Sequence, residues 1–269
     1  METFVHNQTS MHYTIAGNQL PTLLFVHGSN IDLTYWEAQL AYFKDKYTVV
    51  ALDLPGHGKS GRNKTHWTVK SMGEDVATFI KTLNLQQVIL IGHSMGGDVC
   101  LVAATSNPGP IIGLIGIDTF KSAGQPLRPE YQEQSEQIIQ NLHQNFGDTN
   151  EQYARMVLLT PQTPVAVSER VVKDYRQAYK PMATEILEAI FKDEYLTERE
   201  LLPRLSVKLQ LINVDYMPTD EGALLQYATA GYEIHHMTGT SHFPMIEQPD
   251  ELNKQLDLVI DVIKQENSG

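Results

Sequence analysis

Ser94 lies at a corner that leaves very little chain for a turn. The segment GHSMG (92–96) follows an apolar run at 88–91 and precedes a helix-like stretch at 100–104. A serine at such a corner is held in strained backbone, exposed and rigid. The N-terminus of the following helix faces it and favours developing negative charge. Strand, Gly-x-Ser-x-Gly turn and helix together predict a nucleophilic serine.

A nucleophilic serine needs a base, and one of the ten histidines fits that role. His242 follows the last strand-like segment and precedes a proline and a C-terminal helix-like stretch. His235 and His236 lie inside the strand-like run before it and are predicted to be structural. His93 adjoins the serine, and we expect it to turn away into packing or hydrogen bonds. The predicted pair is therefore Ser94 and His242.

The elements that position these residues alternate along the chain. Six apolar runs are strand-like: 22–28, 47–56, 87–94, 111–118, 207–215 and 232–239. Helical patterns occupy 35–46, 69–83 and 249–265. Nearly continuous Val, Ile and Leu content is typical of strands buried on both faces of a mainly parallel sheet. The pattern predicts an α/β fold, with a mainly parallel sheet flanked by helices.

The alternation breaks between residues 121 and 203. This segment has no strand-like run and several amphipathic stretches, so we expect a helical cap inserted into a core domain of residues 1–120 and 204–269. The alternative is a set of crossover helices with no lid role. Seven of its apolar and aromatic side chains could line an acyl pocket, although helical spacing favours a place in the core of the cap. They are Phe146, Tyr153, Met156, Val157, Leu158, Tyr175 and Phe191.

Composition excludes several classes of protein. With 269 residues, one large domain or a domain with an insertion is expected. A net charge of -12 argues against nucleic-acid and anionic-membrane binding. The single cysteine, Cys100, fits a reducing compartment, and neither a signal peptide nor a membrane-spanning run is visible. These features predict a cytoplasmic protein, and they leave a monomer and a homodimer as alternatives.

Four motifs, in order, resemble the α/β-hydrolase family over essentially the whole chain. FVHGS resembles its oxyanion-hole loop, ALDLPGHGKS its D-x-P-G-x-G-x-S segment and IGHSMGG its nucleophile elbow. GTSHFPMIEQPDELN resembles the stretch that carries the catalytic histidine. The resemblance implies that the backbone N–H groups of Ser29 and Met95 form the oxyanion hole. The same motifs are much less specific about the substrate.

The acid of the triad has two candidates. Its usual family position is after the second-to-last strand, where this chain has Asp215. Asn213 takes the place of the glycine expected there, and the loop is one residue shorter than the family pattern. Some relatives carry the acid at the end of the preceding strand, where Asp118 lies. We favour Asp118, keep Asp215 as the alternative and rank Asp220 third.

The predicted reaction is acyl transfer to water through an acyl-enzyme, on small to medium carboxylic esters. A serine at the elbow argues against dehalogenation, which in this fold uses an aspartate there. A lactonase, an amidase or aminopeptidase, a C–C bond hydrolase, a cofactor-free perhydrolase and a slow-turnover small-molecule receptor remain alternatives on the same residues. Neither a metal nor a nucleotide signature is visible, so no cofactor is expected.

Overall fold

Eight strands form one mixed sheet in the computed structural model, which describes residues 2–267. Met1 and residues 268–269, the two ends of the predicted core domain, lie outside this range. In sheet order the strands are β1 (Glu2–His6), β2 (Thr9–Ala16), β4 (Thr48–Leu52), β3 (Thr22–Val26), β5 (Val88–His93), β6 (Ile111–Ile117), β7 (Leu209–Val214) and β8 (Tyr232–Met237). The strands from β3 to β8 run parallel, and β2 pairs antiparallel with β1 and β4. The predicted α/β fold is confirmed.

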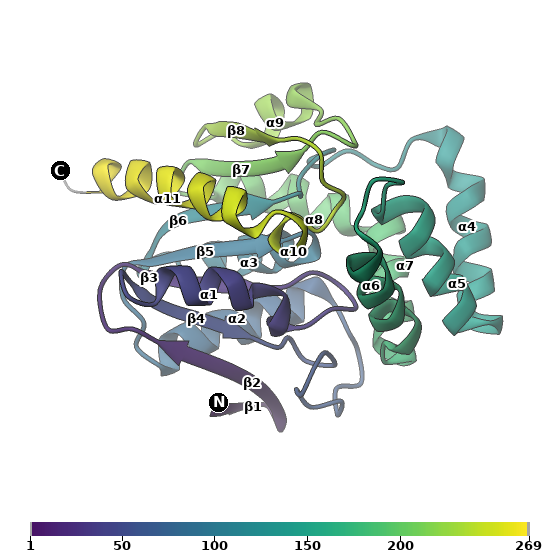
Figure 1. Ribbon diagram of the computed structural model, residues 1–269, viewed down its shortest axis with the longest axis horizontal. Coiled ribbons are helices and arrows are strands. Elements are labelled where there is room, and N and C mark those ends of the chain that lie inside the picture. The colour runs from purple at the N-terminus through teal and green to yellow at the C-terminus, as the bar shows by residue number, and fades with distance from the viewer. Residues whose placement is uncertain (1, 268–269) are drawn as a thin grey trace.

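Helices cover both faces of this sheet (Figure 1). They are α1 (Glu37–Phe43), α2 (Val69–Thr82), α3 (Met95–Ser106), α9 (Glu221–Tyr227), α10 (Pro244–Glu247) and α11 (Pro249–Glu266), with a 3-10 turn at Leu33–Trp36 before α1. Alternate residues of one strand point to opposite faces, so Leu24 and Leu90 pack on the α2–α3 side. Their neighbours Leu23 and Ile89 pack on the α1–α11 side. Burial on both faces explains the continuous apolar runs.

The first two strands were not predicted. In β2, Thr9, Met11 and Tyr13 are buried and alternate with more exposed residues, which is the period-two pattern of a half-buried strand. The rings of Phe4 and Tyr13 lie edge-on to Phe79 of α2, with ring centroids 5.4 and 5.0 Å apart. The β1–β2 hairpin thereby extends the sheet beyond β4.

The segment between β6 and β7 is helical, as predicted. It contains α4 (Pro129–Gln144), α5 (Phe146–Tyr153), a π-helical turn (Ala154–Leu158), α6 (Val165–Gln177), α7 (Lys180–Lys192) and α8 (Glu194–Leu201). Of these helices, α4 to α7 lie beyond the carboxyl ends of the parallel strands, on the right of Figure 1, whereas α8 packs on α3. The Tyr35 hydroxyl donates to Asp174 at 2.8 Å, and Arg170 donates to the Thr34 hydroxyl at 2.7 Å. Both bonds join α6 to the core.

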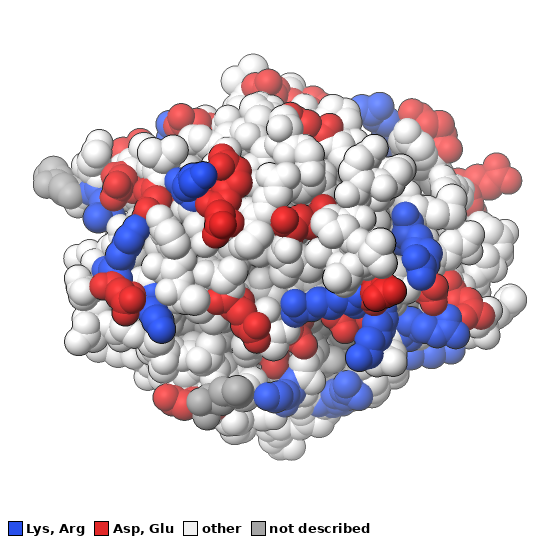
Figure 2. Space-filling view, in the orientation of Figure 1, with Lys and Arg blue, Asp and Glu red and all other residues white. Residues whose placement is uncertain are grey.

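The surface carries both signs of charge. On the face drawn in Figure 2, acidic and basic side chains are interspersed, and basic ones gather toward the lower right, where α6 lies in Figure 1. Among residues 2–267, no helix combines the length and the hydropathy that crossing a membrane requires.

Three carboxyl groups meet where α8 packs on α3. Asp98, in the first turn of α3, is buried within hydrogen-bonding reach of Glu194 and Glu198 of α8. Burial raises the pKa of all three carboxyls, that of Glu194 to about 8, and nearby negative charge adds to the effect on Asp98 and Glu194. The Oδ1 atom of Asp98 and the Oε1 atom of Glu194 are buried, and no donor within residues 2–267 reaches them.

These carboxyls make stability depend on pH. A carboxyl whose pKa is raised by folding binds more protons in the folded state than in the unfolded state. Its contribution to the free energy of unfolding is therefore fully present below the pKa of the unfolded state, and it is lost as pH rises through the pKa of the folded state. Glu194→Gln removes the charge, so we expect its Tm to exceed that of the wild type by about 2–4 °C near pH 8.5. Near pH 5 the two values of Tm should agree.

Thermal melts followed by circular dichroism at the two pH values measure this difference. Glu133→Gln, which alters an exposed carboxyl of α4, is the matched control and should follow the wild type at both. If the Tm difference between Glu194→Gln and the wild type were the same at both pH values, the raised pKa of Glu194 would be contradicted.

Candidate active site

Ser94 lies between β5 and α3 in a backbone conformation that residues other than glycine rarely adopt. Its φ is 52° and its ψ is -128°, a region that favours glycine and costs about 1–3 kcal/mol for other residues. The Ser94 N–H donates to the Ile117 carbonyl at 3.0 Å, which ties the turn to the end of β6. A Cβ at Gly92 would lie 2.3 Å from the Gly96 carbonyl oxygen, so the strand and helix meet this closely only around glycine.

His242 and Asp118 are hydrogen-bonded to each other. The His242 Nδ1 atom lies 2.6 Å from Asp118 Oδ2, and both side chains are buried. Nδ1 must carry a proton to donate to the carboxylate, which leaves Nε2 as the acceptor of the ring. The histidine backbone is also fixed, because its N–H donates to the Leu158 carbonyl at 3.0 Å and its carbonyl accepts from His93 Nε2 at 2.7 Å.

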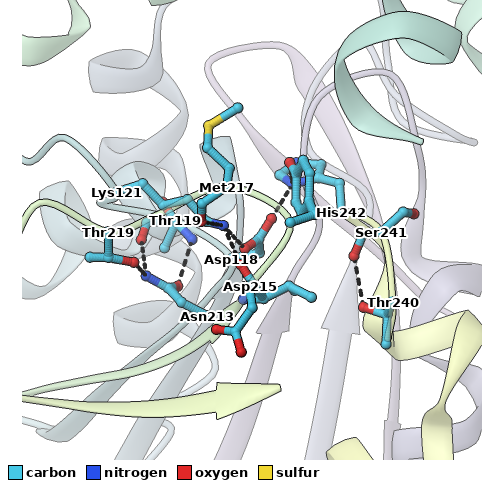
Figure 3. A network of polar contacts seen from close by, with 12 residues as sticks. Asp118, Thr119, Lys121, Asn213, Asp215, Met217, Thr219, Thr240, Ser241 and His242 are labelled. Atoms are coloured by element: carbon cyan, nitrogen blue, oxygen red, sulfur yellow. Dashed lines mark hydrogen bonds and ion pairs between the residues drawn. The ribbon is translucent and has the colours of Figure 1, made fainter. Parts of the chain in front are cut away.

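Both oxygens of the Asp118 carboxylate have hydrogen-bond or ion-pair partners (Figure 3). It directly follows β6, and its Oδ1 atom lies 2.7 Å from Lys121 Nζ and accepts the Val214 N–H at 3.0 Å. Burial by itself raises the pKa of this carboxyl. The hydrogen bond and charge of His242, and then those of Lys121, outweigh burial and lower the pKa below its ordinary value.

Asp215, the alternative acid, points away from His242 (Figure 3). Its Oδ1 atom lies 3.0 Å from His236 Nδ1, and both side chains of this pair are largely exposed. Asp220 instead caps α9 by accepting the Ala223 N–H at 3.2 Å. The structure thus brings His242 together with Asp118, and not with these two aspartates. His236 lies in β8, as does His235, where the sequence places both.

Asn213, next to the end of β7, is hydrogen-bonded to residues that follow β6 and β7. Its buried side chain accepts the Thr119 N–H and donates to the Thr119 carbonyl, both at 3.1 Å, and it also donates to the Thr219 hydroxyl at 2.9 Å. An asparagine here ties the end of β7 to the end of β6, where Asp118 lies. In the sequence alone, Asn213 is only a departure from the family pattern.

Two more residues of this network were not predicted. Lys121 contacts Asp118, and the Tyr216 hydroxyl lies 3.3 Å from His242 Nδ1. The lysine three positions after a candidate acid was a visible signal, although this spacing is common on any surface. No feature of the sequence indicated that Tyr216 would reach the histidine.

The two expected oxyanion donors lie on a loop and at the start of a helix. Ser29 follows β3, and Met95 is the first residue of α3. The backbone N–H groups of both residues donate no hydrogen bond within residues 2–267. The Ser29 hydroxyl is within hydrogen-bonding reach of Tyr175 of α6.

His27 fixes the loop that carries Ser29. Its Nε2 atom accepts the Leu54 N–H at 2.9 Å, so its protonated Nδ1 donates to the Gly28 carbonyl at 2.7 Å. The Asp53 carboxylate, from the same loop as Leu54, accepts the Leu33 N–H at 2.8 Å. The loops after β3 and β4 therefore support each other.

His93 is buried and turned away from the reaction, as expected. Burial first, and then the neighbouring His242, hold the pKa of His93 well below its ordinary value, so its ring is neutral. A Cβ at Gly28 would lie 2.7 Å from His93 Nδ1. His93 therefore packs between the loop of the expected oxyanion donor and the loop of His242.

Aromatic side chains of the inserted helices face the loop of His242. Tyr175 packs edge-on to Phe243, with ring centroids 6.4 Å apart, and Tyr153 lies between Tyr175 and Phe191 at 6.4 and 6.0 Å. Met156, which was expected to line a pocket or to fill the core of the cap, is instead 68% exposed.

Comparison with known proteins now gives the family. Residues 21–248 match the family model of the alpha/beta hydrolase fold. The chain belongs to the α/β-hydrolase family. Over 96% of both chains, the hydrolase is 25% identical to 3-oxoadipate enol-lactonase 2 of Acinetobacter baylyi.

Other similarities are partial or concern the fold. The hydrolase is 38% identical to the dihydrolipoyllysine-residue acetyltransferase component of the acetoin cleaving system of Cupriavidus necator, over 39% of its own length and 28% of that protein. It thus spans little more than a quarter of that relative. It superposes on a thermophilic esterase from Thermogutta terrifontis with a TM-score of 0.80, at 21% identity and with 97% of each chain covered.

Proposed function

We propose that this hydrolase cleaves small to medium carboxylic esters through an acyl-enzyme, with Ser94 as nucleophile, His242 as base and Asp118 as acid. The observation that carries the proposal is the 2.6 Å contact between His242 Nδ1 and Asp118 Oδ2. It gives the histidine the tautomer that accepts a proton on Nε2. The strained elbow at Ser94 and the unpaired N–H groups of Ser29 and Met95 support the same assignment.

The reaction proceeds in two halves. The Ser94 hydroxyl oxygen attacks the ester carbonyl carbon while His242 Nε2 takes the hydroxyl proton, and Asp118 stabilises the imidazolium that forms. The carbonyl oxygen becomes an oxyanion that accepts hydrogen bonds from the N–H groups of Ser29 and Met95. The intermediate collapses, and the leaving alcohol takes the proton from His242. Water then repeats the sequence on the acyl-enzyme and releases the carboxylic acid.

We further propose that residues 121–203 act as a cap over a core domain of residues 1–120 and 204–269. Helices α4 to α7 of this segment lie beyond the carboxyl ends of the strands, where Ser94 and Asp118 are found (Figure 1). Tyr175 reaches both the Ser29 hydroxyl and the Phe243 ring. The proposed cap thus contacts the loop that carries Ser29 and the loop that carries His242.

Lactone hydrolysis is the second candidate. A lactone is a cyclic ester and needs the same nucleophile, base and oxyanion donors, so the site geometry serves both. The similarity to 3-oxoadipate enol-lactonase 2 across 96% of both chains favours it.

A substrate panel with active-site labelling tests the proposal. We expect steady turnover of p-nitrophenyl acetate and butyrate, and covalent labelling of Ser94 by a fluorophosphonate probe. Comparison with an unstrained γ-lactone and an enol-lactone would then rank open-chain and cyclic esters. A burst of one equivalent without further turnover would instead indicate a small-molecule receptor. An unlabelled Ser94 in folded protein would exclude the serine mechanism.

A further inference from the structure

We propose that Lys121 is a positioning residue that supplies a buried counter-charge to Asp118 and thereby sets the lower pH limit of catalysis. The inference rests on the proposed function, because it concerns the acid of that triad. Lys121 neither touches the reacting atoms nor follows from any motif, and its role is read from its contacts.

The Lys121 ammonium is enclosed by acceptors (Figure 3). Its Nζ atom lies 2.7 Å from Asp118 Oδ1, and it donates to the Val214 carbonyl at 2.6 Å and to the Met217 carbonyl at 2.8 Å. These three contacts use all three N–H groups of the ammonium. The same nitrogen lies 4.6 Å from the centroid of the Tyr216 ring, a cation–π distance.

Both partners are withdrawn from water. The side chain of Lys121 is 11% exposed and that of Asp118 is 0% exposed, so the charges interact with little screening. The two carbonyls belong to the last residue of β7 and to the loop after it, where the alternative acid Asp215 lies. Lys121 therefore joins this loop to the carboxylate at the end of β6, and it fixes the oxygen that His242 does not use.

The charge of Lys121 has a consequence for His242. During catalysis His242 becomes an imidazolium, which the negative charge of Asp118 stabilises. The Lys121 ammonium, next to the Oδ1 atom of Asp118, offsets part of that negative charge. Without Lys121 the Asp118 carboxylate would stabilise the imidazolium more strongly. Loss of the ammonium also favours protonation of the buried carboxyl. Both effects remove active enzyme at the acidic end of the pH range.

Other titratable groups also face His242. The substitutions at Lys121 leave all of these side chains in place. Burial raises the pKa of Tyr216, which stays protonated, and His93 is neutral. Burial also raises the pKa of Glu247, whose Oε1 atom accepts the Ser241 N–H at 3.0 Å. Since these groups are common to the wild type and the variants, a difference between their pH profiles reports on Lys121.

The experiment measures kcat/KM for p-nitrophenyl butyrate from about pH 5 to 9 in wild type, Lys121→Gln and Lys121→Met. Gln keeps amide donors for the carbonyls without the charge, whereas Met removes donors and charge. Lys46→Met is the matched control, because it removes a paired but exposed lysine that lies 2.6 Å from Asp257. We expect the acid limb to move to higher pH by about one unit in both Lys121 variants, about a tenfold loss at the acidic end.

The outcomes separate this inference from the proposed function. If wild type hydrolyses the ester and labels at Ser94, while Lys121→Gln has the wild-type acid limb, the counter-charge role is wrong and the triad stands. If wild type is inactive and unlabelled, the proposed function fails first. An equal loss of kcat/KM at every pH, or loss of folding in both Lys121 variants, would make Lys121 purely structural and overturn the inference. Partial recovery of Lys121→Ala by added propylammonium would support it.

Discussion

Ser94→Ala is expected to lower kcat for ester hydrolysis by at least about 10⁴-fold, with an unchanged far-UV circular dichroism spectrum. The physical reason is that the acyl-enzyme needs the hydroxyl oxygen, and the residual rate comes only from binding and the oxyanion donors. Combining Ser94→Ala with His242→Ala should cost little more than either change, because triad members act as a unit. Steady-state kinetics with p-nitrophenyl butyrate measure the loss.

Ser106→Ala is the matched control, because Ser106 is an exposed serine at the end of the same helix, α3. It should keep wild-type kcat and wild-type labelling by the fluorophosphonate probe. Near wild-type hydrolysis by folded Ser94→Ala would remove this serine from the mechanism.

Asp118→Asn should lower kcat by about 10⁴-fold, whereas Asp215→Asn should cost less than about tenfold. Asparagine has nearly the same shape as aspartate, but it carries no charge, and its NH₂ group can face His242 Nδ1 and impose the wrong tautomer. The Asp215 carboxylate instead lies 3.0 Å from His236 Nδ1, and this pair is largely exposed, so its charge is screened by water. The two variants, assayed side by side, control for each other.

A different ranking would change the mechanism. If Asp215→Asn were the more damaging variant, the loop after β7 would have to rearrange when substrate binds. If neither variant lost activity, a Ser94–His242 dyad would replace the triad.

The parallel sheet was predictable because its strands are buried on both faces, which leaves unbroken apolar runs such as 22–26 and 88–91. The β1–β2 hairpin was not predicted, because β1 is mostly exposed and β2 buries only every second residue. A search for period-two patterns in the first residues could have found β2. The helices between β6 and β7 followed from their amphipathic periodicity.

In the site, the elbow and the histidine loop could be located because each follows a strand and has a local pattern of glycine or proline. The choice of acid depends on contacts that no local pattern encodes. Asn213 bridges to Thr119, 94 positions earlier in the chain, and Lys121 reaches a carbonyl 93 positions later. Only the pairing of β6 with β7 brings these groups together. Sequence reasoning could therefore name two aspartates and favour one, but it could not find the lysine that accompanies it.

The backbone at position 94 sets a limit on optimising this sequence for stability. At φ 52° and ψ -128° glycine is the residue best suited to the conformation, so a design procedure that scores folding alone would choose glycine there. Asp118, at φ 48°, is a second position where the backbone disfavours the residue that the chemistry needs. Under the proposed mechanism, a computational search that scores folding stability alone would therefore replace the nucleophile. Libraries aimed at a hardier variant should hold both positions fixed and vary the sheet faces and outer helices instead.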